Sequence, residues 1–274
     1  MLPDNQVTEF REVVWDYFGT HRRDMPWRDD PSPYHVLVSE LMLQQTQVNR
    51  VLPKYQEFMT RFPAIADLAA ASLSDVLAVW SGLGYNRRAK FLHAAAQKVV
   101  SDFGGELPST REELVSLPGI GPNTAGAILA YAFNQPVVFI ETNVRTVLFH
   151  HFFADQVDID DKLLLPIVQQ TCDPEHPREW YWALMDYGTY LKQTAGNNIS
   201  QSKHYARQSK FEGSRRQIRG RILRELVAGG RPTEELVALL ADDRSQSVLD
   251  DLSNEGLIEQ EAGLVRLTGS SKLP

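Results

Sequence analysis

The chain has 274 residues, of which 43% are hydrophobic and 23% charged, a composition typical of a soluble globular protein with about two domains. Its formal net charge of −7 does not indicate a nucleic-acid binder, and its single cysteine, Cys172, excludes a disulfide framework or a four-cysteine cluster within one chain. No apolar run approaches the roughly 20 residues that span a bilayer, and residues 1–6 lack the charged start and apolar core of a signal peptide, so we expect a cytoplasmic protein.

Apolar residues at helical spacing predict a mainly α fold through the first 192 residues. Pro26, Pro31 and Pro33 predict a loop after the first helix, and the short apolar run 136–140 is ambiguous in type. We expect helices over 6–23, 34–60, 64–70, 73–81, 86–103, 110–116, 122–133, 161–171 and 178–192, and one that begins near Thr142 or Asn143.

The predicted helix 34–60 carries a polar interruption. Gln44 and Gln45 stand where the apolar stripe of a core-facing helix would continue. Glu40, Gln44 and Gln47 share a second face of the same helix. A carboxylate backed by amides is typical either of a solvated surface or of the wall of a polar cleft, and the spacing alone leaves both open.

Residues 117–129 predict a tight hairpin followed at once by a helix. Gly119 and Gly121 permit φ values that other residues resist, and Pro122 suits the first turn of a helix. Bare backbone N–H groups in front of the positive end of a helix dipole form an anion site. The same residues would also suit an ordinary turn between two helices.

The polar stretch 194–214, rich in Ser, Gln and Asn, predicts a long loop. A basic run extends from this loop into the next segment, with Glu212 as its one acid: Lys203, Arg207, Lys210, Arg215, Arg216, Arg219, Arg221 and Arg224. A local basic band matters more to a phosphate backbone than the net charge of a chain, although a solvated helix face would have the same composition.

Beyond residue 215 the pattern changes to three short helices followed by two short strands, at 256–260 and 264–267. This order is typical of a winged-helix module. The third helix, over about 244–255, carries three acidic residues and one basic residue, which is unfavourable for lying in a DNA groove. Packing or contact with another protein explains this helix at least as well.

Five motifs that occur in register resemble the helix-hairpin-helix DNA glycosylases over about residues 1–192. The motifs lie at 25–28, 33–34, 39–48, 82–85 and 117–121. The run around Gln44 and Gln45 is similar to the adenine-specific branch, which removes adenine mispaired with guanine or 8-oxoguanine. One hairpin alone would be weak evidence, whereas five motifs in the family's order are specific.

The resemblance implies a two-lobed helix-hairpin-helix DNA glycosylase fold, mainly α, with a small C-terminal winged-helix-like α+β module. Residues 1–24 and 134–192 would form the lobe that carries the second carboxylate. Residues 25–133 would form the lobe with the hairpin, 193–214 a basic loop, and 215–274 the module.

In this family two carboxylates perform the chemistry. Glu40 matches the glutamate that protonates adenine at N7 and later helps to activate water, and such an acid needs partial burial because burial disfavours the charged form. The second carboxylate stabilises the sugar cation or forms a covalent intermediate, as in glycoside hydrolysis. The family has Asp there, whereas this chain has Glu141. The extra methylene moves the carboxylate by on the order of an ångström, and a misplacement of that size can lower the rate about a hundredfold. Either the backbone is set back to compensate, or the activity is altered.

The resemblance implies further site residues. Gln45 matches a residue that wedges into the base stack and Tyr85 an aromatic inserted beside the opposite base, and both would hold open a duplex whose target base is flipped. Arg28 and Asp186 match positions of the base pocket near adenine. The two hairpin glycines would hold a DNA phosphate through backbone N–H groups, with a monovalent cation on the hairpin carbonyls.

Three departures from the family pattern affect the expected activity. Asn123 stands where the lyase members, such as endonuclease III, have a lysine nucleophile, so we expect a monofunctional glycosylase. Residues 189–214 contain no cysteine, so we expect no iron–sulfur cluster and no other cofactor. Lys203, Arg207 and Lys210 would grip phosphates in place of the cluster segment. The family's C-terminal domain that recognises 8-oxoguanine is not recognisable.

We therefore predict a clusterless base excision repair glycosylase that flips adenine opposite 8-oxoguanine or guanine and hydrolyses its N-glycosyl bond. We expect its partner to be double-stranded DNA with a mismatch or lesion, not a membrane, and the protein to be a nucleoid-associated monomer. Two alternatives remain open. One is a mismatch glycosylase for thymine or uracil opposite guanine, which Glu40 disfavours because N7 protonation is a purine strategy. The other is a non-catalytic DNA-binding protein that keeps the same scaffold. In that case Glu141, in place of the family's Asp, would be a sign that the catalytic site has decayed.

Overall fold

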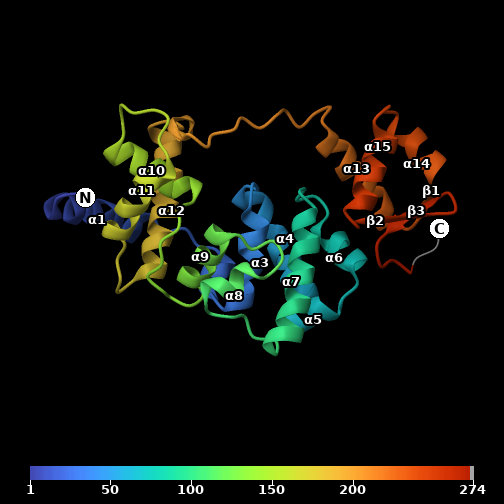
Figure 1. The fold of residues 1–274 in the computed structure, drawn as a ribbon, viewed down its shortest axis with the longest axis horizontal. Coiled ribbons are helices and arrows are strands. Elements are labelled where there is room, and N and C mark those ends of the chain that lie inside the picture. The colour runs from blue at the N-terminus through green and yellow to red at the C-terminus, as the bar shows by residue number, and fades with distance from the viewer. Residues whose placement is uncertain (272–274) are drawn as a thin grey trace. The chain divides into compact units, whose positions relative to one another are not determined.

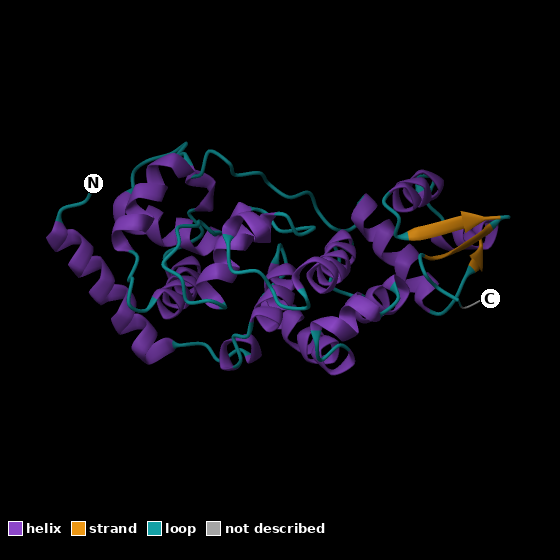
Figure 2. Cartoon of the chain, turned by 60° about the horizontal axis from the view of Figure 1, so that its bottom comes forward, coloured by secondary structure: helices purple, strands orange, loops and turns teal. Residues whose placement is uncertain are grey.

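The computed structural model describes residues 1–271, and most of these residues are helical (Figure 1). Strands occur in a small sheet near the C-terminus (Figure 2). Contacts along the chain define two compact units. The first comprises Met1–Val36, Ser109–Ser116 and Ile120–Arg207, and the second comprises Leu37–Pro108, Leu117–Gly119 and Gln208–Pro274.

The first unit is built around helix α12 (Pro177–Thr194). This helix packs against α1 (Asp4–His21), α9 (Pro122–Tyr131) and α10 (Thr142–Phe152). Aromatic side chains fill the contacts, and the rings of Phe139 and Tyr181 stack with centroids 4.1 Å apart. The remaining elements are α2 (Pro26–Asp29), α8 (Arg111–Val115), α11 (Asp161–Thr171) and the 3-10 turn η1 (Ile199–Gln201).

The helical part of the second unit is centred on α7 (Arg87–Phe103). Helices α5 (Ile65–Ala70) and α6 (Leu73–Trp80) pack against α7, and α4 (Val48–Arg61) packs against α6. Helix α3 (Pro33–Leu43) leads into this unit. The buried rings of Phe58 and Trp80 meet edge to face, with centroids 6.2 Å apart.

The predicted winged-helix-like module is confirmed and belongs to the second unit. It consists of α13 (Arg215–Val227), α14 (Thr233–Leu240), α15 (Ser245–Asn254) and an antiparallel sheet of order β1-β3-β2, with β1 at Arg231–Pro232, β2 at Ile258–Glu261 and β3 at Leu264–Leu267. The module contacts the helical part directly. Helix α13 packs on α6, and Lys90 Nζ donates a 2.5 Å hydrogen bond to the carbonyl oxygen of Glu255.

Two predicted boundaries were wrong. The single helix expected over 34–60 is two helices, because α3 ends at Leu43 and Gln45 adopts a left-handed φ of 55° that no helix accommodates. The loop expected after the first helix contains the short helix α2, which begins at Pro26 because a proline at the first helical position lacks only an N–H that would have had no partner. The ambiguous run 136–140 is neither helix nor strand.

Candidate functional site

Glu40 lies in the last turn of α3, on a helix whose other side is fully packed. Leu37, Leu41 and Met42 are at most 1% exposed, whereas Glu40 is only half-buried. The helix therefore directs its apolar residues into the second unit and leaves one carboxylate partly shielded from water. Partial shielding is the environment that a general acid needs.

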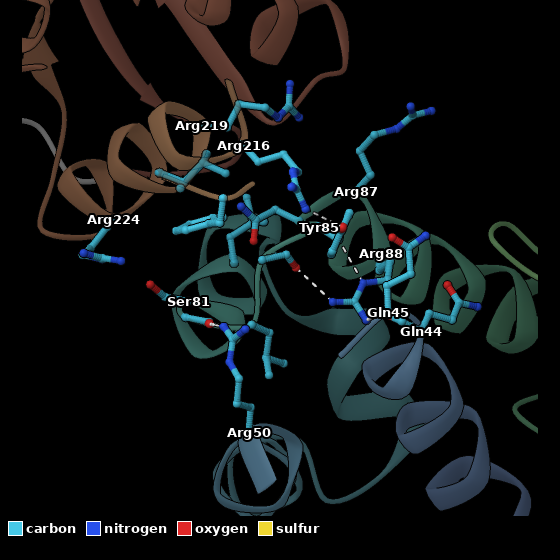
Figure 3. A pocket seen from close by; sticks show the side chains of 18 of the residues that line it. Gln44, Gln45, Arg50, Ser81, Tyr85, Arg87, Arg88, Arg216, Arg219 and Arg224 are labelled. Carbon is cyan, nitrogen blue, oxygen red and sulfur yellow. Dashed lines mark hydrogen bonds between the residues drawn. The ribbon is translucent and has the colours of Figure 1, made fainter. Parts of the chain in front are cut away.

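Buried Arg88 of α7 holds the turn that follows α3. Its Nη1 donates hydrogen bonds of 2.7, 2.8 and 2.6 Å to the carbonyl oxygens of Leu41, Met42 and Gln44. Its Nη2 donates a 3.0 Å bond to the carbonyl oxygen of Gly84. Burial lowers the pKa of Arg88 to about 10, so the guanidinium stays charged at neutral pH. One buried cation thus ties the turn after α3 to the loop 82–85 (Figure 3).

Gln45 and Tyr85 both have backbones in the left-handed region, with φ of 55° and 49°. Such a conformation costs a residue with a Cβ on the order of 1 kcal/mol and persists only where the surroundings impose it. Both side chains line one cavity of about 1000 Å³ in the second unit (Figure 3). The Tyr85 hydroxyl bonds to Arg216 Nη1 at 2.9 Å and to Gln208 Nε2. The fold therefore brings together the two side chains expected to wedge into DNA.

Replacing Gln45 by glycine separates a wedge role from a packing role. Glycine accepts φ of 55° without strain but is more flexible in the unfolded chain, so we expect the free energy of unfolding to change by less than about 1 kcal/mol. Loss of the side chain should lower the single-turnover rate of base release on a mismatched duplex about tenfold or more, since flipping costs a few kcal/mol. Ala241→Gly, at another exposed left-handed position with φ of 50°, is the matched control and should leave that rate unchanged. An unchanged rate of base release for Gln45→Gly would show that Gln45 does not act as a wedge.

The predicted hairpin is present, but only Gly119 needs the conformational freedom of glycine, because Gly121 has an ordinary φ of −89°. Gly119 has φ of 79°, and a Cβ there would lie 2.6 Å from the Cβ of Phe91. Gly121 is the N-cap of α9, and an added Cβ would meet nothing within 4 Å. The backbone in front of α9 is therefore open, as a phosphate site requires. Asn123 lies exposed in the first turn of α9.

In the first unit, Glu141 is the half-buried N-cap residue of α10. The start of α10 is fixed by α12, because Asn143 Nδ2 donates a 3.0 Å hydrogen bond to the carbonyl oxygen of Met185, and Lys192 Nζ donates a 2.5 Å bond to Asn143 Oδ1. A Cβ on Gly188 would lie 2.6 Å from the Asn143 carbonyl oxygen, so only glycine permits this close approach. The backbone that presents Glu141 is therefore rigidly held.

Arg28 and Asp186, the predicted base-pocket residues, form a buried bidentate ion pair in the first unit. Arg28 Nη1 and Nη2 donate to the two Asp186 carboxylate oxygens at 2.8 and 2.9 Å, and both side chains are at most 3% exposed. Arg23 Nε adds a 2.6 Å bond to Asp186. The Arg28 guanidinium also lies 5.4 Å from the ring centroid of Trp182. The structure therefore places Arg28 and Asp186 in contact with each other inside the first unit.

Asp186→Asn is expected to destabilise the protein by about 3 kcal/mol or more. Removing one partner of a buried pair leaves the other charge uncompensated, and Arg28 is 5% exposed. Urea unfolding of parent and variant measures the loss as a lower midpoint with an unchanged slope. Asp24→Asn makes the same change at an exposed position and should leave the midpoint in place. Equal midpoints for Asp186→Asn and the parent would show that the pair contributes nothing to folding.

The basic residues of the long loop are exposed. Lys203 and Arg207 belong to the first unit and Lys210 to the second, and Lys203 Nζ lies 3.4 Å from Asp160 Oδ2. Within residues 1–271 no group of three or more His, Cys, Asp or Glu side chains could hold a metal ion. Burial raises the pKa of the Cys172 thiol to about 11, so it stays protonated. In the same described part, every helix is too short or too polar to cross a membrane.

The helical fold, the hairpin before α9 and the sequence motifs agree with those of the helix-hairpin-helix DNA glycosylases. Residues 38–166 match the model of the HhH-GPD superfamily base excision DNA repair proteins. Along its length the chain is 32% identical, over 292 residues, to the adenine DNA glycosylase of Mycolicibacterium smegmatis, covering 93% of this chain and 95% of that protein. The chain belongs to the adenine DNA glycosylase family of this superfamily.

Other relatives are matched over part of their length. The mouse adenine DNA glycosylase is 40% identical over 194 residues, which are 66% of this chain and 38% of the mouse protein, so the chain spans well under half of that relative. A thermostable thymine-DNA glycosylase structure is 25% identical with a TM-score of 0.61, covering 68% of this chain and 87% of that one. A non-covalent endonuclease III–DNA complex, 18% identical with a TM-score of 0.56, covers 71% and 87% and shows the fold alone.

Proposed function

We propose that this chain is a monofunctional DNA glycosylase of base excision repair, which hydrolyses the N-glycosyl bond of adenine mispaired with 8-oxoguanine or guanine. The similarity to the mycobacterial adenine DNA glycosylase over 95% of that protein's length supports this most directly. The half-buried Glu40, at the end of a packed helix and next to the paired glutamines, supplies the acid that such a reaction needs.

The chemistry divides between two carboxyl groups. Glu40 donates its proton to N7 of the flipped adenine, so the base leaves as a neutral molecule while positive charge develops on the sugar. Glu141 places negative charge beside that sugar and stabilises the cation or bonds to it. Water then supplies the hydroxyl at C1′, and its proton returns to Glu40. Since α12 holds the start of α10, the longer Glu141 side chain extends from a fixed backbone.

The other site residues bind DNA in this proposal. Gly119 and Gly121 bind a phosphate through backbone N–H groups, with a monovalent cation on the hairpin carbonyls. Gln45 wedges into the base stack and Tyr85 inserts beside the opposite base. Arg28 and Asp186 support the wall of the adenine pocket. Asn123 has a carboxamide in place of an amine, so it forms no Schiff base, and we expect no strand cleavage.

We further propose that the enzyme works without an iron–sulfur cluster. Such a cluster needs four thiolates or their equivalents, and the chain has one cysteine, which is buried and protonated. The exposed Lys203, Arg207 and Lys210 take over phosphate contacts in this proposal. The same proposal includes the four-part division of the chain. It also includes action as a monomer on mismatched double-stranded DNA, and a location in the cytoplasm at the nucleoid.

A panel of duplexes tests the function. Each duplex carries adenine, thymine, uracil or hypoxanthine opposite guanine or 8-oxoguanine, and strand cleavage is measured in single turnover with and without alkali. We expect cleavage of the adenine strand only after alkali treatment. Cleavage without alkali would contradict the monofunctional assignment, and no adenine release from any duplex would exclude the glycosylase proposed here.

A second candidate is a mismatch glycosylase for thymine or uracil opposite guanine. The similarity to the thermostable thymine-DNA glycosylase favours it. Glu40 argues against it, because a proton donor at N7 serves purines alone. Thymine release exceeding adenine release in the same panel would establish this candidate. Tight binding of mismatched duplex without any base release would instead establish the non-catalytic binder.

A further inference from the structure

Arginines surround the cavity that Gln45 and Tyr85 line in the second unit. Six arginines from α4, α7 and α13 contribute to its wall (Figure 3): Arg50, Arg87, Arg88, Arg216, Arg219 and Arg224. Glu255 is the one carboxylate among its lining residues. A chain with a formal net charge of −7 therefore concentrates positive charge at one place. Such a local basic surface attracts a phosphate backbone.

Helix α13 presents these charges from a well-packed base. Its inner side is buried in the module through Ile218, Ile222 and Leu226, which are at most 5% exposed. Arg216, Gly220 and Arg224 follow one another at four-residue spacing and line the cavity. A Cβ on Gly220 would meet nothing within 4 Å, so the helix surface between the two arginines is open.

Helix α15, which a helix-turn-helix protein would lay in the DNA groove, is unsuited to that role here. It and its C-cap carry Asp250, Asp251 and Glu255. Two of these carboxylates are already bound to α13, since Arg215 lies 2.5 Å from Asp251 and Arg219 lies 2.5 Å from Glu255. The acidic helix thus braces α13 through these two ion pairs, and its own charges would repel phosphates.

Most of the cavity's positive charge is not neutralised. Arg87 and Arg224 are exposed and take part in no ion pair within residues 1–271. Arg216 bonds to the Tyr85 hydroxyl and lies 5.9 Å from its ring centroid, so its charge is not cancelled by a carboxylate either. The exposed ring of Phe211 lines the same space, and an aromatic face among arginines suits nucleic acid better than a free anion.

We propose that the winged-helix-like module binds DNA through α13, whose Arg216 and Arg224, together with Arg87 of α7, contact the phosphodiester backbone next to the Tyr85 loop. The inference deepens the proposed function and rests on it, because it takes duplex DNA as the partner. It assigns the module's first helix, rather than α15, to the nucleic acid. The Tyr85 loop and the module then contact the same stretch of the DNA backbone.

The salt dependence of binding tests this assignment. The full-length double variant Arg87→Gln/Arg224→Gln removes two exposed charges that make no ion pair, so folding should be unaffected. Fluorescence anisotropy with a labelled A·G mismatch duplex and with its fully paired counterpart gives the dissociation constant between about 50 and 200 mM salt. We expect the affinity to fall about tenfold or more on both duplexes. The plot of the log of the association constant against log salt should become shallower by about 2, one unit per lost phosphate contact.

The control removes the same charge away from the cavity. Arg61→Gln/Lys162→Gln changes one exposed residue of α4 and one of α11, neither of which lines the cavity, and should leave the slope unchanged. An unchanged slope in the cavity variant, or an equal fall in the control, would overturn the inference. Adenine release by the parent chain is measured separately. If the cavity variant gives a shallower slope but the parent releases no adenine, the proposed function alone is contradicted. If the parent releases adenine but the slope of the cavity variant is unchanged, this inference alone is contradicted.

Discussion

Glu40→Gln should lower the single-turnover rate of adenine release at least about a thousandfold, the upper part of the range that a positioned proton donor supplies. Glutamine has the same shape and fits the half-buried position at the end of α3, but it has no proton to give to N7. The variant should fold as the parent does and still bind a duplex with adenine opposite 8-oxoguanine. The measurement is the rate of alkali-revealed cleavage at saturating enzyme.

Glu57→Gln provides a matched control for this prediction. Glu57 lies exposed on α4, where its carboxylate is 2.8 Å from Lys54 Nζ, and a surface pair of this kind contributes little to stability. Its substitution makes the same chemical change in the same unit and should leave the rate unchanged. A Glu40→Gln rate within threefold of the parent rate would remove Glu40 from the chemistry.

Arg88→Lys should give the second-largest effect, through geometry rather than chemistry. The guanidinium donates to carbonyl oxygens on both the turn after α3 and the loop 82–85, and a lysine ammonium cannot reach both. We expect the free energy of unfolding to fall by about 3 kcal/mol, because buried carbonyl groups lose charged donors. Well below the melting temperature, the rate of adenine release should fall about a hundredfold, as an ångström of misplacement allows.

A fluorescent base distinguishes positioning from mere instability. With 2-aminopurine beside the mismatch, the unstacking that accompanies base flipping appears as an increase in fluorescence. Folded Arg88→Lys should show a smaller increase than the parent at equal occupancy. Arg61→Lys, at an exposed arginine of α4, should match the parent in both measurements. A normal fluorescence increase with the stability loss alone would make Arg88 a packing residue.

The helices were largely predictable because their signals are local. The helix predicted over 161–171 is α11 with the same bounds, and the hairpin and the three helices of the module were also confirmed. The break between α3 and α4 was not predictable in this way. It depends on Arg88, which lies more than 40 residues further along the chain and binds the carbonyl oxygens that helical hydrogen bonds would otherwise use. The strand β1 has two residues, too few to show alternation.

The candidate site was predictable to the extent that its residues sit in motifs. Gln45 and Tyr85 were named from their motifs, and the structure adds that they share one cavity and similar backbone strain. Arg88 was missed because a single arginine in a helix has no sequence signal of burial. The ion pair between Arg28 and Asp186 could not be predicted from the sequence either. The two residues are 158 positions apart, and only the folded chain brings them together.

Direct identification of the released base tests the central claim most simply. A duplex with adenine opposite 8-oxoguanine is incubated with excess enzyme, and the small molecules are separated by chromatography before any alkali is added. We expect free adenine in an amount equal to the abasic sites formed, and none with Glu40→Gln. Absence of adenine while the duplex is bound, or thymine released from a T·G duplex in its place, would contradict the claim.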